Sequence, residues 1–238
     1  KSLVKKPYKS RFEATFESLT YLGEKDVYDC NVDVDHFFDA NGIVVHNCGE
    51  QTLPAGKSKD GNFHLLGVCN LSSIHAAHRS LWKAAGSYDW AAMREIVKLQ
   101  QRFMDNVTDV CWFPLPAQNL TARLERRNGG GFAGVAEFLS RSKVAFGSPK
   151  GLALVERLYR EYNEASLEAS KELAKERGTY PLYTGSQFEK FGLKVRNSCM
   201  TNNAPTGTLA QIMQTTWGIE PHHGIVFSRQ VRTDRVDF

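Results

Sequence analysis

Two long stretches of helical periodicity constrain the fold of this 238-residue chain more than any other feature. In residues 89–111, apolar side chains recur at the spacing of one helix face, at Met93, Ile96, Val97, Phe103, Met104, Val107 and Val110. Asp89 comes just before them as the N-cap. The pattern therefore predicts a helix that buries one apolar face in a core.

The second stretch, residues 150–177, has the same periodicity over a greater length. Its apolar positions are Val155, Leu158, Tyr159, Tyr162, Ala165, Ala169 and Leu173. Ser148-Pro149 supplies a helix start and Gly178 a C-terminal cap. Short apolar runs separate the two predicted helices, and this alternation is typical of an α/β fold.

Residues 20–47 follow a different pattern, the alternation of β-strands. Asn41-Gly42 is the strongest short signal for a hairpin, and a two-residue turn there determines which positions pair. The predicted pairs are Ala40 with Ile43, Phe38 with Val45 and His36 with Asn47. We therefore expect a domain boundary near residue 47, between a β-rich segment and an α/β body.

Composition disfavours several functional classes. The net charge is only +4, and the one local basic cluster is Arg123, Arg126 and Arg127, so a nucleic-acid surface is not expected. No apolar run approaches the roughly 18 residues that span a bilayer, so we expect a cytoplasmic protein without a membrane segment.

The 5 cysteines include no C-x-x-C pair, and no carboxylate or cysteine completes a metal set at His222-His223. We expect reduced thiols and no metal. The chain starts without Met and ends without a tail, as a fragment would.

The strand pattern stops at His46-Asn47-Cys48. An asparagine side-chain amide can attack its own main-chain carbonyl, forming a succinimide and releasing the segment that follows. This reaction needs groups that polarise the amide and the leaving nitrogen. His46 is adjacent, and the hairpin register places His36 opposite Asn47, so two imidazoles would flank the bond as general acid and base. Cys48 supplies a thiol that can accept an acyl group.

The segment VYDCNVDVDHFFDANGIVVHN, followed by Cys, resembles the C-terminal end of an intein, a self-splicing insert with a compact all-β (Hint-type) fold. The resemblance implies that the splicing residues are Asp29, His36, His46 and Asn47, and that Cys48 is the first residue of the host protein. The intein's N-terminal nucleophile and Thr-x-x-His block are absent from this sequence. Splicing would therefore need a complementary piece, joined in cis or supplied in trans.

The segments that follow Cys48 resemble, in order, the C-terminal part of a ribonucleotide reductase catalytic chain. They are CGEQTLP, GVCNLSSI, MDNVTDV, PLPAQ, RRNGGGFAGVAEFL, RNSCMTNNAPTGTLAQI and GIEP. The closest resemblance is to the adenosylcobalamin-dependent class. It implies that residues 48–238 are part of a reductase-type α/β barrel, preceded by an intein tail over residues 1–47. Gly129-Gly130-Gly131 departs from the usual Arg-Arg-Ile-Gly-Leu-Gly pattern, which puts the local packing in doubt.

Replacing a ribose 2′-hydroxyl by hydrogen needs a radical that activates the neighbouring C3′–H bond, and a thiyl radical can take that hydrogen reversibly. On the resemblance, Cys48 would carry the radical and Glu50 would be the general base for the 3′-hydroxyl. Cys69 would be one of two thiols that close a disulfide, with its partner upstream. The substrate phosphates would bind at Ala204, Pro205, Thr206, Gly207 and Thr208. Cys111 and Cys199 are expected to be core thiols.

The resemblance also implies a cofactor and partners. The cofactor would be adenosylcobalamin, with a metal-radical partner subunit as the alternative. The substrate would be a ribonucleoside di- or triphosphate, the reductant a thioredoxin-like protein, and the completed enzyme a homo-oligomer. The unspliced chain should be inactive. Two alternatives stay open: an autoprocessing domain attached to a non-catalytic cargo or binding module, and a relic that no longer splices.

Overall fold

A β-hairpin occurs where the sequence predicts it. The structure is a computed structural model that describes residues 37–40, 43–46, 51, 53–57, 61, 64–84, 86–222 and 224. Strands β1 (Phe37–Ala40) and β2 (Ile43–His46) pair antiparallel, with Ala40 opposite Ile43 and Phe38 opposite Val45. Both predicted pairs are confirmed. The third pair, His36 with Asn47, lies outside the described residues.

The chain divides into two units, residues 1–65 and 66–238. The boundary expected near residue 47 stays a prediction. Strands β3 (Ala55–Lys57) and β4 (His64–Leu66) form a second two-stranded sheet.

The second unit contains a parallel sheet. Strand β5 (Asn70–His75) runs parallel to β6 (Asn128–Ala133), with Asn70 opposite Asn128 and His75 opposite Ala133. A parallel bridge from Gly130 to Thr201 adds a third extended segment on the other side of β6. There the Asn202 amide donates to the Gly130 carbonyl at 2.7 Å. Strand β6 is therefore the central member of three parallel segments.

Helices make the connections that parallel strands require. Between β5 and β6 lie η2 (Arg79–Leu81), α1 (Trp90–Val110) and α2 (Pro116–Glu125). Between β6 and the third segment lie α3 (Val135–Arg141), α4 (Pro149–Arg177), η3 (Pro181–Tyr183) and α5 (Gln187–Lys190). Helix α6 (Gly207–Met213) follows. The α/β class is confirmed; no closed barrel is formed within the described residues.

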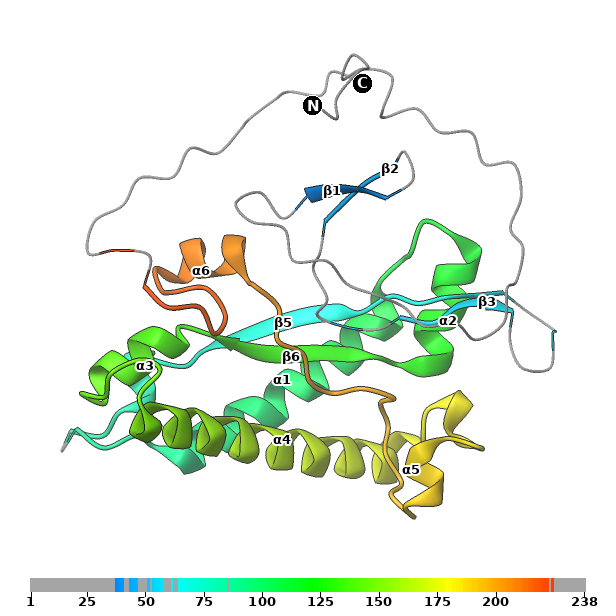
Figure 1. Ribbon diagram of the computed structural model, residues 1–238. Coiled ribbons are helices and arrows are strands. Elements are labelled where there is room, and N and C mark those ends of the chain that lie inside the picture. The colour runs from blue at the N-terminus through cyan, green and yellow to red at the C-terminus, as the bar shows by residue number, and fades with distance from the viewer. Residues whose placement is uncertain are drawn as a thin grey trace, which may run out of the picture. The chain divides into compact units, whose positions relative to one another are not determined.

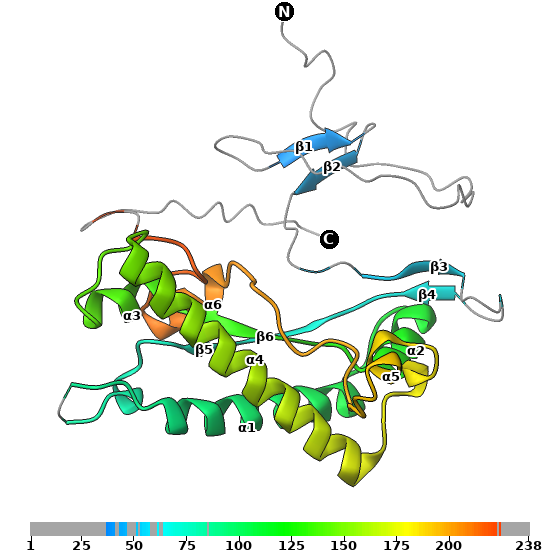
Figure 2. The same cartoon turned by 60° about the horizontal axis from the view of Figure 1, so that its bottom comes forward.

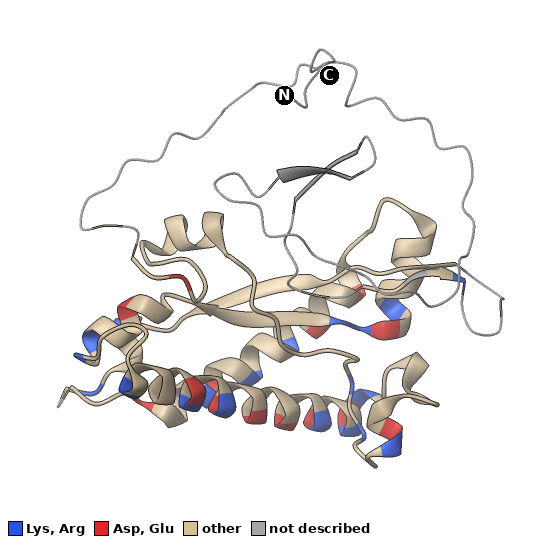
Figure 3. Cartoon of the chain, viewed as in Figure 1, with Lys and Arg blue, Asp and Glu red and all other residues tan. Residues whose placement is uncertain are grey.

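Helices α1 and α4 cover the same face of the parallel sheet, as two views show (Figures 1 and 2). Three ion pairs join successive turns of the two helices: Arg94–Glu168, Lys98–Glu172 and Arg102–Glu176. Each pair is separated by 74 positions, so the two helices run parallel to each other. The hydrogen bond from Arg102 is the main reason that the pKa of Glu176 is lowered to about 2. Figure 3 shows these charges along α4.

The predicted helix ends are confirmed. The Asp89 carboxylate accepts a hydrogen bond from the Ala92 amide at 3.1 Å, and α1 starts at the next residue. The Ser148 hydroxyl accepts from the Gly151 amide at 3.1 Å, and α4 ends before Gly178. The predicted apolar face of α4 is buried at Leu158, Tyr162, Ala165, Ala169 and Leu173. Local capping chemistry therefore determines where both helices begin.

The single buried face predicted for α1 is wrong. Met93, Val97 and Met104 are buried in the core as expected. Four other apolar residues are exposed and form what we call the α1 stripe: Ile96 at 36%, Leu99 at 67%, Phe103 at 60% and Val110 at 83%. Spacings of three and four residues fit either face of a helix. The sequence pattern therefore assigned the apolar residues of two different faces to a single face.

Glycine at position 130 lets β6 approach the helices closely. A Cβ atom there would collide with the Tyr162 hydroxyl and would lie 3.0 Å from Gln101 Nε2 and Met104 Cε. The Tyr162 hydroxyl donates to Gln100 Oε1 at 2.6 Å, and burial raises the pKa of Tyr162. The glycine run therefore belongs to a buried strand, and its lack of side chains is what permits this packing.

We expect Gly130→Ala to lower the free energy of unfolding by about 1–3 kcal/mol, because the core around Tyr162 must shift to admit a methyl group. Urea unfolding followed by tryptophan fluorescence measures the change. Gly192→Ala is the control, since a Cβ atom there meets nothing within 4 Å and only its φ of +67° is unfavourable. That backbone cost is about 1 kcal/mol. A loss at Gly130 no larger than this control would contradict the steric argument.

Candidate functional site

One face of the parallel sheet is turned away from α1 and α4. On β5, Asn70 and Ser72 point toward α1: Asn70 Nδ2 donates to Thr108 Oγ1 at 2.9 Å, and Gln100 Nε2 donates to Ser72 Oγ at 3.2 Å. Ile74 joins the core on the same side. Because side chains alternate along a strand, those on the face opposite α1 and α4 are Cys69, Leu71, Ser73 and His75. Leu71 is 51% exposed there.

Cys69, the predicted redox thiol, lies against β6 on the face opposite α1 and α4. A Cβ atom at Gly129 would lie 2.5 Å from Cys69 Sγ and 2.7 Å from the end of Leu71. The thiol is partly buried, and the carbonyl of Asn70 lies 3.7 Å away as an acceptor. Gly129 therefore provides the space that the thiol occupies.

Arg127 lies close enough to this thiol to interact with it electrostatically. Its guanidinium donates to both carboxylate oxygens of Glu125, at 3.2 and 3.3 Å. Burial acts to lower the pKa of Arg127, but Glu125, Cys199 and Cys69 together raise it. A permanent cation therefore lies near two thiols. Cys199 and Cys111 are partly buried, as Cys69 is, and their assignment as core thiols stays a prediction.

The predicted phosphate segment, residues 204–208, leads into α6 as expected. Thr206 has a left-handed backbone (φ 55°), and its hydroxyl accepts a hydrogen bond from the Gly218 amide at 2.9 Å. Ala204 is buried, and its carbonyl oxygen would be 2.8 Å from a Cβ atom at Gly218. The segment is therefore held to the 218 turn. Helix α6 contacts β5, and Figure 1 shows it near one end of the sheet.

A polar cluster at the end of β5 was not found from the sequence. The Thr215 hydroxyl donates to Glu137 Oε2 at 2.7 Å, and His75 Nε2 lies 3.8 Å from the same oxygen. Burial lowers the pKa of His75, and the charge of Glu137 opposes this shift. A Cβ atom at Gly134 would collide with Thr215 and the His75 ring. The cluster connects the loop after α6 to the end of β5.

The basic cluster noticed in the sequence is partly neutralised by carboxylates. Arg126 is buried, with its Nε 2.8 Å from Asp105 and its Nη1 2.7 Å from Asp109. Arg177 reaches the other oxygen of Asp105 at 3.0 Å. Such a buried ionic group is costly to break and already has its counter-ions. Arg126 therefore does not contribute to a cationic surface for nucleic acid.

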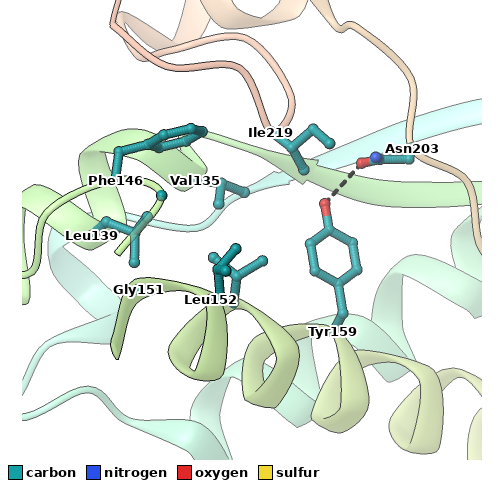
Figure 4. Close-up of a pocket in the computed structure, with 10 residues that line it drawn as sticks. Val135, Leu139, Phe146, Gly151, Leu152, Tyr159, Asn203 and Ile219 are labelled. Atoms are coloured by element: carbon teal, nitrogen blue, oxygen red, sulfur yellow. Dashed lines mark hydrogen bonds between the residues drawn. The ribbon is translucent and has the colours of Figure 1, made fainter. Parts of the chain in front are cut away.

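A mostly apolar pocket of about 440 Å³ lies beside the segment that leads into residues 204–208. Figure 4 shows Phe146, Leu152 and Ile219 around it, with the Tyr159 hydroxyl donating to Asn203 Oδ1 at 2.8 Å. Among the predicted site residues that the structure describes, Cys69 and residues 204–208 do not line this pocket.

The structure describes only part of the predicted site. Cys69 and residues 204–208 are described, whereas Asp29, His36, Asn47, Cys48 and Glu50 lie outside the described residues. Of His46 only the backbone is described, in β2. Among the residues that are described, no three His, Cys, Asp or Glu side chains form a group that could hold a metal ion. The described helices include none with the length and apolarity that a bilayer crossing requires.

Comparison with known proteins identifies the family. The family described as "ribonucleotide reductase, barrel domain" matches residues 27–195. The vitamin B12-dependent ribonucleoside-diphosphate reductase of Mycobacterium tuberculosis (strain H37Rv) is 40% identical over 163 residues, which cover 68% of this chain and 22% of the relative. The protein of the same name from Thermoplasma acidophilum is 36% identical over 185 residues, or 77% of this chain and 22% of the relative.

A more distant relative is the ribonucleoside-diphosphate reductase subunit alpha of Treponema pallidum, which is 30% identical over 175 residues. Those residues cover 65% of this chain and 20% of that protein, so the chain spans about a fifth of the length of the curated relatives it matches. The described α/β unit, with its three parallel segments covered by two parallel helices, agrees with part of a barrel. The chain therefore belongs to the ribonucleotide reductase barrel-domain family.

Proposed function

We propose that this chain forms part of a ribonucleotide reductase, with Cys48 as the radical-bearing thiol, Glu50 as general base and Cys69 as one of two reducing thiols. The main support is that Cys69 lies on the face of the parallel sheet opposite α1 and α4, in a chain that belongs to this family. In a closed barrel that face is the interior, where the reacting groups of several strands can meet. An outward-facing Cys69 would have argued against the role.

The proposed reaction balances in atoms and electrons. The Cys48 thiyl radical takes the hydrogen from C3′ of the ribose, and Glu50 takes the proton of the 3′-hydroxyl. A proton from one thiol of the pair formed by Cys69 and an upstream cysteine lets the 2′-hydroxyl leave as water. The pair then supplies two electrons and its second proton, which place a hydrogen on C2′, and closes a disulfide. Glu50 returns its proton to the 3′-oxygen and Cys48 returns its hydrogen to C3′, so the products are a deoxyribonucleotide, water and a disulfide.

The relatives' names guide the choice of substrate and cofactor. All three are named ribonucleoside-diphosphate reductases, which favours a diphosphate substrate here. Two of them are named vitamin B12-dependent, which favours adenosylcobalamin over a metal-radical subunit. The described residues give no separate support for this group, because Cys69 and Leu71 fill the space beside Gly129. When bound, it would supply the organic radical that activates Cys48.

The remaining roles follow the family resemblance. Residues 204–208 would bind the substrate phosphates through backbone amides and the Thr208 hydroxyl, since the Thr206 hydroxyl already accepts from Gly218. A thioredoxin-like protein would reduce the disulfide, and the completed enzyme would be a homo-oligomer. A cytoplasmic setting suits this chemistry, because thiols stay reduced there.

The proposal includes protein splicing at Asn47/Cys48, with residues 1–47 as the end of an intein. The register of β1 and β2 supports this. Phe37 is opposite His46, so the same register continued by one residue would pair His36 with Asn47. The competing assignment gives residues 27–47 to the reductase itself, since the family match begins at residue 27. Splicing chemistry in the purified precursor separates the two assignments.

We expect Cys69→Ser to abolish sustained turnover in the completed enzyme, by about 10³-fold or more, because serine cannot close the disulfide that supplies two electrons. Deoxynucleotide formation with a thioredoxin-type reductant measures the effect. Cys111→Ser is the matched control: Cys111 is also partly exposed, but it lies at the C-terminal cap of α1. Turnover of Cys69→Ser near the unsubstituted rate would show that Cys69 is not a reducing thiol.

A further inference from the structure

Helix α1 presents apolar side chains to solvent along most of its length. The α1 stripe, which consists of Ile96, Leu99, Phe103 and Val110, repeats at intervals of three, four and seven residues. Residues at these intervals lie on one side of a helix, one or two turns apart. A contiguous exposed patch of this kind marks a surface that another protein element covers.

The stripe lies on the side of α1 that the described elements leave uncovered. One face of α1 packs on β5 and β6 through Met93 and Val97. A second face holds Arg94, Lys98 and Arg102, which pair with acidic residues of α4. At 3.6 residues per turn, the stripe is roughly 140° around the helix axis from those basic residues. It is therefore on the flank away from α4.

That flank is also the open edge of the sheet. Strand β6 has neighbours on both sides, whereas among the described residues β5 pairs only with β6. In a parallel α/β sheet each strand is accompanied by its own helix, and neighbouring helices pack side by side. A further strand–helix unit added beyond β5 would therefore place its helix against the α1 stripe.

The chain's relatives indicate what covers the stripe. This chain spans 22% of the Mycobacterium tuberculosis reductase, so most of such a protein lies outside it. The family is described as a barrel, and closing a barrel removes every sheet edge. The basic side chains of α1 are already paired with α4, so the stripe itself offers apolar contacts. An apolar helix fits it better than an acidic segment does.

We propose that the α1 stripe is the docking surface for the part of the reductase that this chain lacks, and that an apolar helix of that part covers it. The inference rests on the proposed function in one respect, that the chain is one piece of a larger catalytic chain. Where the two pieces are separate polypeptides, this contact would bring them together without a covalent bond.

The test measures docking without ligation. This chain, carrying Asn47→Ala to block cyclisation, is titrated by calorimetry with the remainder of the catalytic chain expressed as a separate polypeptide. We expect Leu99→Glu combined with Phe103→Glu to raise the dissociation constant at least tenfold, because two apolar side chains would be replaced by charges in a dry contact. Leu152→Glu is the matched control: its side chain is 62% exposed on α4, and we expect a change of less than twofold.

Hydrogen exchange of the unsubstituted stripe gives a second measurement that does not depend on the double variant. Adding the remainder of the chain should slow amide exchange in residues 96–110 and leave residues 152–160 unchanged. Unaltered binding by the double variant, or unaltered exchange in α1, would overturn the proposal. A stripe that only mediates self-association, seen by sedimentation as a dimer that Leu99→Glu converts to a monomer, would also overturn it. Calorimetry and hydrogen exchange measure docking without splicing or turnover. Docking could therefore fail while the turnover predicted for the proposed function is observed, or the reverse.

Discussion

Cys48→Ser is expected to leave nucleotide binding intact and to lower deoxynucleotide formation by about 10⁴-fold or more, the size of effect seen when a residue essential to the chemical step is removed. A serine O–H bond is much stronger than a thiol S–H bond, so the cofactor's radical cannot be passed to this side chain. The substitution should be made in a reductase joined directly across position 47/48, because Cys48 has a separate role in splicing. Turnover assays and equilibrium nucleotide binding are measured on the same preparation.

Two results define the meaning of this experiment. Loss of turnover with unchanged nucleotide affinity would assign Cys48 to the chemical step. Cys199→Ser is the control, because that thiol is partly exposed and belongs to the same α/β unit as Cys69. If Cys48→Ser retained turnover at the control's level, the radical site would have to be another residue, and the family's chemistry would not apply at this position.

The helix boundaries and the hairpin register could be predicted because they depend on neighbours in the sequence. Asp89 and Ser148 cap their helices through amides three residues away, at Ala92 and Gly151. The two-residue turn at Asn41-Gly42 determines the pairs of β1 and β2. No distant contact is needed for either inference, so the pattern alone is sufficient.

The polar clusters could not be predicted because they join residues that are distant in sequence. Thr215 reaches Glu137 across 78 positions, and Arg177 reaches Asp105 across 72. Single-sequence patterns do not encode such contacts. The prediction of a single buried face for α1 failed for a related reason. An apolar side chain is expected to be covered, but the sequence does not show which element covers it. Leu99 and Met93 are both apolar, yet only Met93 is covered within this chain.

For the same reason, only part of the predicted site could be inferred from the sequence. Cys69 could be assigned a chemical role from its surrounding motif, but its position over Gly129 depends on the pairing of β5 with β6. Asn128 and Gly130 seemed anomalous beside the family pattern, whereas Gly129 matches it. The Cβ position of Gly129 is filled by the Cys69 thiol on one face, and that of Gly130 by the Tyr162 hydroxyl on the other. Each glycine is therefore required by the group that approaches it.

Asn47→Ala is expected to abolish release of the segment that starts at Cys48, because alanine has no side-chain amide to attack the main-chain carbonyl. The effect should be complete, since every other route to cleavage at this bond is ordinary peptide hydrolysis, which is immeasurably slow on this timescale. The precursor is mixed with a complementary intein piece, and products are followed by intact-mass spectrometry. His36→Ala should slow release while leaving the amide in place, and so it reports the acid–base contribution, typically 10²–10⁴-fold. Release that persists in Asn47→Ala would exclude cyclisation, and residues 27–47 would then be assigned to the reductase barrel rather than to an intein.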